Sequence, residues 1–194
     1  MTHDPLVHLS SVLDLAESLI EGVRPEQAGL PTPCRSWDVR ALVAHLVYDT
    51  GQFTVAATGG RPDWRAPVPE IDGDWASAFR AGAAGLRAAW DRAGDLGQEI
   101  ELAIGRVPRS FVASQQVAEF GVHAWDLATA TGQRANFPAQ ACEAALAWGR
   151  TVMRPEFRGD EASGMAFGPE VEVPGDAPAE DRLAAFYGRH PRGA

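Results

Sequence analysis

The sequence has 194 residues, of which 45% are hydrophobic, and a formal net charge of −9 at pH 7. This predicts a globular chain with a sizeable core, organised as one domain or as one domain with an appendage. The acidic balance and the lack of a Lys/Arg cluster argue against nucleic acid and anionic membranes as partners. No apolar run approaches about 18 residues and no signal peptide is visible. Two cysteines, Cys34 and Cys142, are too few for a disulfide framework, so we expect a cytoplasmic protein.

Helices dominate the predicted elements. In chain order we expect helices over 4–23, 37–58 and 75–93, a short edge strand over 99–107, helices over 111–131 and 138–153, and at most a short final helix over 181–187. Ser36 is the expected cap of the second helix. The pattern predicts an all-α fold with at most one short strand pair: a four-helix bundle over 1–155 and a short irregular C-terminal extension over 156–194 packed on it.

The predicted helix over 111–131 carries a polar stripe between apolar flanks. At about 100° per residue, the stripe covers an arc of roughly 80° and consists of Gln116, Glu119, His123 and Asp126. A solvent-facing surface would carry Lys, Arg and Glu broadly, so we expect these polar groups to face inward. Glu119 and His123 have i, i+4 spacing, so both can reach one point in space.

The predicted helix over 37–58 repeats this pattern. With His45 as the origin and about 100° per residue, Asp49 lies near 40° and Gln52 near −20°. Apolar residues, including Phe53, surround them. His45 and His123 are too far apart in sequence to form a local motif, so they can meet only if the two helices pack face to face.

Together the two stripes supply two imidazoles and a carboxylate, from His45, His123 and Glu119. This ligand set is typical of a catalytic metal site with an open position. Zinc suits the set best, and nickel and iron also fit it. Asp49 and Asp126 are then candidates to hold the imidazoles through their other ring nitrogen. The alternative is a group of buried hydrogen-bond partners without a metal, because a lone histidine on a helix is more often a core residue than a ligand.

An open coordination position needs a route for substrate, so we expect the three ligands to lie at the floor of a pocket. The residues one turn away on the same stripes, Asp49, Gln52 and Gln116, are expected to line its walls. Phe53 is expected to supply an apolar surface. A metal in such a pocket would lower the pKa of a bound water or thiol and so produce a nucleophile at neutral pH.

The loop over 31–35 leads into the second helix and is expected at the rim of this pocket. Its cysteine, Cys34, has no role assigned by the sequence, because an isolated cysteine in a reduced protein is most often a small buried apolar group. The sequence shows no serine or cysteine triad and no glycine-rich phosphate loop. The metal is therefore the only catalytic centre that we predict.

Three segments of the sequence carry a resemblance: PTPCRSWDVRALVAHLV (31–47), EFGVHAWDLATATG (119–132) and VPGDAPAEDRLAAFYGRHP (173–191). They resemble an actinobacterial branch of the DinB-like superfamily, which includes the metal-binding N-terminal domain of mycothiol-dependent maleylpyruvate isomerase. The resemblance implies a DinB-like four-helix bundle with a divalent metal held by His45, Glu119 and His123. It also implies a thiol such as mycothiol as a cosubstrate. The isomerase has an additional C-terminal α/β domain, for which residues 156–194 are too short.

Three functions remain as hypotheses. The first is a metal-dependent, thiol-using transferase or isomerase acting on a small molecule. The second is a metal-dependent hydrolase built on the same three residues. The third is a non-catalytic bundle in which the metal or the buried histidines only stabilise the fold. The sequence does not identify the organic substrate, and it leaves a homodimer open.

Overall fold

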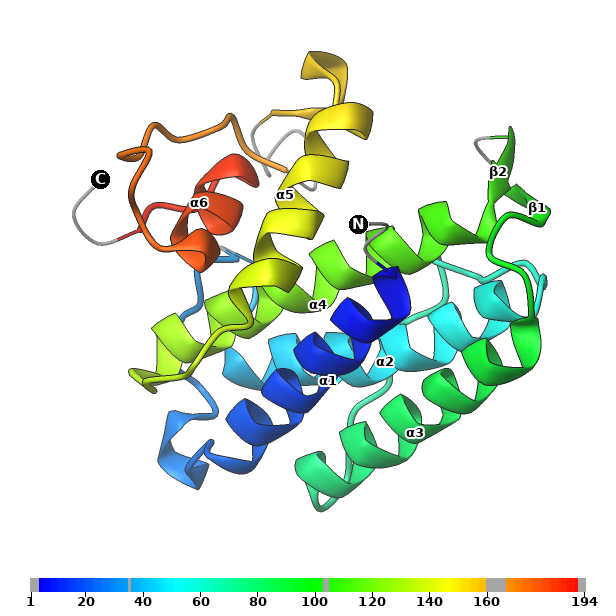
Figure 1. The fold of residues 1–194 in the computed structure, drawn as a ribbon. Helices are drawn as coiled ribbons and strands as arrows, with labels where there is room; N and C mark the ends of the chain where they lie inside the picture. The colour runs from blue at the N-terminus through cyan, green and yellow to red at the C-terminus, as the bar shows by residue number, and fades with distance from the viewer. Residues whose placement is uncertain (1–3, 35, 103–104, 160–166, 192–194) are drawn as a thin grey trace.

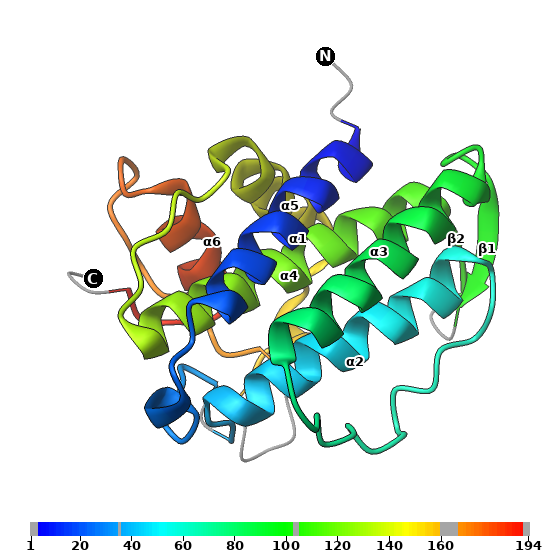
Figure 2. The same ribbon diagram turned by 90° about the horizontal axis from the view of Figure 1, so that it is seen from below.

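The computed structural model describes residues 4–34, 36–102, 105–159 and 167–191. Four long helices form its bundle (Figures 1 and 2). They are α1 (Pro5–Glu21), α2 (Val39–Ala57), α3 (Trp75–Ala93) and α4 (Arg109–Thr131). Helix α1 packs against α3 and α4, and α2 packs against the same two helices. The faces of α2 and α4 are thereby brought together, as the two polar stripes require.

The helix ends follow from local chemistry. Asp4 caps α1, because its side chain accepts a hydrogen bond from the Leu6 amide at 2.9 Å. Gly132 ends α4 in the left-handed conformation, with φ of 68°, which glycine adopts without steric cost. The predicted start of the second helix was two residues early and its cap was wrong. Asp38, rather than Ser36, accepts the capping bond from the Ala41 amide at 2.8 Å.

Two short strands connect α3 to α4. They are β1 (Glu99–Leu102) and β2 (Gly105–Pro108), and they pair antiparallel with Ile100 opposite Val107. The predicted single edge strand over 99–107 is therefore a hairpin, and residues 103–104 lie outside the described residues. The expected all-α fold with one short strand pair is confirmed.

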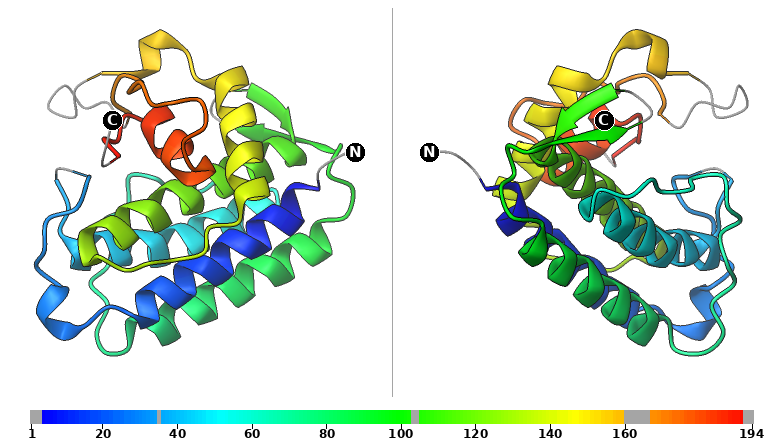
Figure 3. Two further views of the ribbon diagram at one scale, coloured as in Figure 1. Left: turned by 60° about the vertical axis from the view of Figure 1, so that its left-hand side comes forward. Right: turned by 90° about the vertical axis from the view of Figure 1, so that its right-hand side faces the viewer.

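The remaining helices lie on one side of the bundle (Figure 3). They are α5 (Ala139–Val152) and α6 (Ala179–Phe186). Two 3-10 turns lie elsewhere along the chain, Pro25–Gln27 between α1 and α2 and Pro155–Phe157 after α5. Helices α5 and α6 pack on each other and both contact α4. The chain after α5 thus returns to the bundle helix that carries the longer polar stripe. None of the described helices has the length and apolar composition needed to cross a lipid bilayer.

Candidate metal centre

The side chains of His45, Glu119 and His123 converge between α2 and α4. Glu119 Oε1 lies 3.2 Å from His45 Nε2 and 3.0 Å from His123 Nε2. One ligand atom from each residue lies within 4.8 Å of the others, so one ion could contact all three. The i, i+4 spacing on α4 brings Glu119 to His123, and helix packing brings His45 from 74 positions away.

Trp37, just before α2, fixes the two imidazole rings. Its ring centroid lies 4.4 Å from that of His45 and 5.7 Å from that of His123. The two imidazoles are themselves edge to face, with centroids 5.0 Å apart and planes at 82°. The indole therefore limits rotation of both rings and covers one side of the cluster with apolar surface.

His123 has a complete set of partners on its second ring nitrogen. Asp126 Oδ2 lies 3.0 Å from His123 Nδ1 and also accepts a hydrogen bond from Cys34 Sγ at 3.1 Å. Arg189 donates to both oxygens of Asp126, from Nε at 3.1 Å and from Nη2 at 2.9 Å. Asp126 is fully buried. A carboxylate on Nδ1 places the ring proton there and leaves Nε2 free to bind a metal.

His45 is held differently. Asp49 Oδ2 lies 3.1 Å from His45 Nε2, the same nitrogen that faces Glu119. Asp49 therefore does not hold this imidazole through its other nitrogen, because a residue at i+4 on α2 reaches the same edge of the ring as Glu119. Asp49 is 1% exposed, and its Oδ1 has no hydrogen-bond partner among the described residues.

The crowding of charges displaces the pKa values of these groups. Burial alone would lower the pKa of both histidines. For His45, hydrogen bonds to Asp49 and Glu119 outweigh burial and hold the pKa above its usual value. For His123, bonds to Asp126, Cys34 and Glu119 hold it well above. Burial raises the pKa of Asp49.

The carboxylates that face the imidazoles are displaced in the opposite direction. Burial would raise the pKa of Glu119, but its bonds to His123 and His45 hold it far below its usual value. Burial opposes ionisation of Asp126 as well, yet its bonds to His123 and Arg189 lower the pKa to about 2. Both groups are therefore carboxylates at neutral pH and available as acceptors or ligands.

The residues present fit a divalent cation. Three carboxylates and one guanidinium surround two imidazoles, which leaves an excess of negative charge whenever the imidazoles are neutral. Oδ1 of Asp49 is a buried carboxylate oxygen for which the described residues supply no hydrogen-bond donor, which agrees with this excess of negative charge. The N₂O donor set of His45, Glu119 and His123 is one that zinc, nickel and iron accept.

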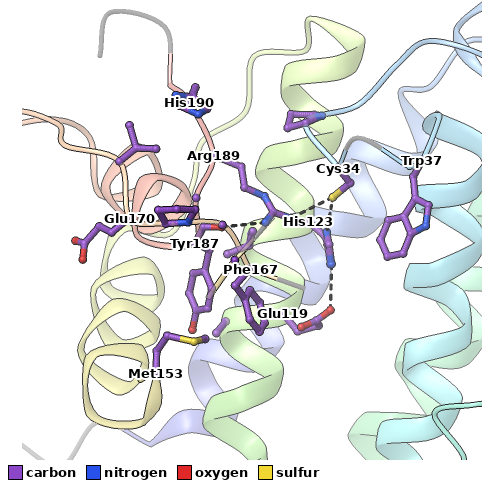
Figure 4. Close-up of a pocket in the computed structure, with 18 of the residues that line it drawn as sticks. Cys34, Trp37, Glu119, His123, Met153, Phe167, Glu170, Tyr187, Arg189 and His190 are labelled. Carbon is purple, nitrogen blue, oxygen red and sulfur yellow. Dashed lines mark hydrogen bonds and ion pairs between the residues drawn. The ribbon is translucent and has the colours of Figure 1, made fainter. Parts of the chain in front are cut away.

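A cavity of about 850 Å³ lies beside the three groups (Figure 4). The bundle side contributes Pro33, Cys34, Trp37, His45, Glu119 and His123, and the opposite side contributes Met153, Phe167, Glu170, Tyr187, Arg189 and His190. The side chain of Glu119 is 23% exposed, toward this space. The cavity volume lies within the range of about 300–1,000 Å³ that small-molecule sites occupy.

The sequence profile described as "Mycothiol maleylpyruvate isomerase N-terminal domain" matches residues 10–128. The chain belongs to this family. Two uncharacterized proteins of Mycobacterium tuberculosis, MT0763 of strain CDC 1551 / Oshkosh and Rv0738 of strain ATCC 25618 / H37Rv, are each 33% identical to it over 190 residues. Each alignment covers 96% of this chain and 98% of the relative.

The crystal structure of the mycothiol-dependent maleylpyruvate isomerase shares the fold, with a TM-score of 0.58 and 20% sequence identity. A mutant of that isomerase, in which a histidine is replaced by alanine, gives a TM-score of 0.59 and 18% identity. Each alignment covers 74% of this chain and 65% of the isomerase chain, so the likeness spans slightly less than two thirds of the isomerase.

Four residues expected to line the pocket, Asp49, Gln52, Gln116 and Phe53, are not among the residues that line this cavity. Gln52 accepts a hydrogen bond from the Asp63 amide at 2.8 Å, and Gln116 accepts one from Trp90 Nε1 at 2.9 Å. Phe53 packs edge to face on Trp64. A position on a helical stripe gives only a direction, and these side chains meet other partners before they reach the cavity: Gln116 meets α3, Gln52 meets the loop before α3, and Phe53 also packs on Phe120 of α4.

The sequence did not identify several residues around the centre. The sequence assigns no role to Cys34. The structure places it at the expected rim, where its thiol donates to Asp126. Arg35 of the same loop lies outside the described residues. Arg189 and Tyr187 come from the tail, where no periodicity marks an inward face. The only hint in the sequence of a functional role for this segment is the pair Arg189-His190 after a short helix, and that hint is weak.

Proposed function

We propose that this chain uses a divalent metal, held by His45, Glu119 and His123, to activate a low-molecular-weight thiol of the mycothiol type. The thiol would serve an isomerase- or transferase-type reaction on a small molecule. The observation that carries the proposal is the cavity of about 850 Å³ with the three groups on its wall. Membership in the isomerase N-terminal domain family supports the thiol.

The bound metal would supply a Lewis acid that lowers the pKa of a thiol. The chain's own residues then have separate tasks. Asp126 keeps the ring proton of His123 on Nδ1, so that Nε2 can act as a ligand. Trp37 holds both imidazole rings in place and excludes water from one side. Glu119 supplies a negative charge to the cavity, because its side chain is partly exposed there.

The opposite wall would bind the organic substrate. Met153, Phe167 and Val171 give it an apolar surface, and Glu170 and His190 add polar groups. Cys34 is not the thiol of this proposal: its Sγ donates to Asp126 and lies 3.1 Å from Arg189 Nη2, and it is not one of the three proposed ligands. A separate thiol cosubstrate would therefore have to enter the cavity.

The test uses the full chain, purified without a metal-affinity tag and loaded with zinc. X-ray absorption at the zinc edge is recorded before and after addition of mycothiol. We expect one zinc per chain and a new zinc–sulfur distance of about 2.3 Å with the thiol. His45→Ala and Glu119→Ala serve as controls that should lose both signals.

Activity assays with maleylpyruvate, with chlorodinitrobenzene and with an ester and an amide, each with and without mycothiol, then separate the hypotheses. Turnover that requires the thiol supports the proposal. Turnover of an ester or amide that proceeds without any thiol would support the hydrolase alternative. If zinc binds without gaining a sulfur neighbour and no substrate is turned over, only the non-catalytic hypothesis remains.

A further inference from the structure

The tail after α6 turns back into the bundle. Gly188 has φ of 83°, and a Cβ placed on it would lie only 2.6 Å from the Cα of Gly168. The turn therefore depends on a glycine, both for its backbone conformation and for the close approach of the two backbone segments. Directly after this turn, Arg189 points toward α4, where its side chain is 10% exposed.

The guanidinium of Arg189 has a partner on each of its three nitrogens. Nε and Nη2 donate to the two oxygens of Asp126 at 3.1 and 2.9 Å, which is the bidentate geometry of a strong Arg–carboxylate pair. Nη2 also lies 3.1 Å from Cys34 Sγ, and Nη1 donates to the carbonyl of Tyr187 at 3.0 Å. The two contacts thus fix the plane of the Asp126 carboxylate.

Asp126 transmits this constraint to His123. Its Oδ2 lies 3.0 Å from His123 Nδ1 and is the same oxygen that Arg189 Nη2 contacts. Without the guanidinium, Asp126 would lose two of its donors and could rotate about its terminal torsion away from the imidazole. The orientation of the ring that faces Glu119 therefore depends on a residue that lies 63 positions after Asp126.

Cys34, His123 and Asp126 also lie close enough together to hold a cation of their own. Arg189 already contacts two of these three groups. Its permanent positive charge beside these groups opposes the binding of a second cation there. We therefore assign this cluster to the support of His123 and not to a second ion.

We propose that Arg189 is a positioning residue for the metal centre. By holding both oxygens of Asp126 it fixes the carboxylate that orients His123, and the C-terminal tail thereby sets the metal affinity of the bundle. This inference rests on the proposed role of His123 as a metal ligand.

The first test compares Arg189→Met with Arg182→Met. Arg182 comes from the same extension and pairs with Glu143, but it does not touch the centre. Zinc affinity is measured by competition with a chelator. We expect Arg189→Met to weaken binding by about 10-fold or more, as loss of outer support for a ligand histidine does. Arg182→Met should change it by less than about 2-fold, because its pair is at the surface.

A double-mutant cycle tests whether the effect passes through Asp126. In an Asp126→Asn background, Arg189→Met should add little further loss, because residues that act through one another are not additive. Arg189→Lys keeps the charge but not the bidentate contact, so it should fall between wild type and Arg189→Met. It also carries the test if Arg189→Met does not fold.

A second readout needs no metal. In the chelated protein, at a pH where the imidazoles are neutral, ¹⁵N NMR of His123 should show the Nδ1-protonated tautomer in wild type and a mixture in Arg189→Met. A tautomer shift in a chain that binds no zinc would refute the proposed function and leave the positioning role intact. Equal zinc affinities and equal tautomer populations in Arg189→Met and Arg182→Met would overturn the inference.

Discussion

His45 and His123 face the same carboxylate from helices with the same polar pattern, yet their surroundings differ. His123 is enclosed: Glu119 faces Nε2, and Asp126, itself held by Arg189, faces Nδ1. Around His45, Asp49 and Glu119 both face Nε2. A carboxylate at i+3 thus supports the far side of a helical imidazole, and one at i+4 competes for the near side. The two stripes supply similar groups but unequal support.

The largest effect is expected when either imidazole is removed. We expect His123→Ala and His45→Ala each to abolish stoichiometric zinc binding, because only two of the three ligands would remain. His123→Ala should still fold, because Asp126 keeps its pair with Arg189. Elemental analysis after zinc incubation and circular dichroism are the measurements. Global unfolding of His123→Ala would instead indicate that the histidines hold the bundle together.

Replacing Asp126 and Asp49 one at a time tests whether the two histidines are supported unequally. Asp126→Asn should weaken zinc binding by about 10- to 100-fold. It should also lower the free energy of unfolding by about 3 kcal/mol, because Arg189 is left buried without its counter-charge. Chelator competition and urea unfolding measure the two effects.

Asp49→Asn is the matched control for that pair. Asp49 is buried with Oδ1 unpartnered among the described residues, so an amide in its place removes a poorly compensated charge. The free energy of unfolding of the metal-free chain should change by less than about 1 kcal/mol. Equal losses of stability and zinc affinity in both variants would mean that Asp49 supports His45 as strongly as Asp126 supports His123.

The pH dependence of stability should reverse with metal. In the metal-free chain, the raised pKa values of His45 and His123 stabilise the fold fully below about pH 6.5, and this contribution is lost as the pH rises through their folded-state values. With zinc, stability should instead increase with pH, because only the neutral imidazole is a ligand. Urea midpoints between about pH 6 and 9, with chelator and with zinc, should therefore diverge.

His123 should account for most of the metal-free trend, because a carboxylate faces each of its two ring nitrogens, whereas the carboxylates around His45 both face Nε2. The same pH series on His123→Ala and His45→Ala in chelator measures each share. A slope that survives unchanged in both variants would have to come from other groups.

The smallest effect is expected at Gln52, which shares the stripe of His45 but not its surroundings. Its Oε1 accepts from the backbone amide of Asp63, on the loop before α3. Gln52→Ala should cost about 1 kcal/mol of stability or less and leave zinc affinity within about 2-fold. A clear loss of zinc affinity would mean that Gln52 contributes to the metal centre after all.

Much of the fold could be predicted because each helix carries its own periodicity and end signals. The convergence of His45 with Glu119 could also be inferred, because an inward polar stripe on α4 needs a polar partner and α2 supplies one. The stripes could not say how far along each helix this contact continues. Gln116 lies one turn from Glu119, yet it faces Trp90 of α3.

The residues of the tail could not be placed in this way. Arg189 lies 155 positions from Cys34, in a segment whose path depends on the backbone contact between Gly188 and Gly168. No spacing rule connects such positions. Only the packed structure shows that a bundle histidine and a tail arginine share one carboxylate.

The distance along the chain between Asp126 and Arg189 has a consequence for biosynthesis. Synthesis proceeds at about 5–20 residues per second, so the 63 positions from Asp126 to Arg189 take roughly 3–13 seconds. Through that interval a growing chain already has His45, Glu119 and His123, while Asp126 still lacks its guanidinium. All three candidate ligands are therefore synthesised before the tail residue that fixes the orientation of His123 and before the residues of the opposite cavity wall.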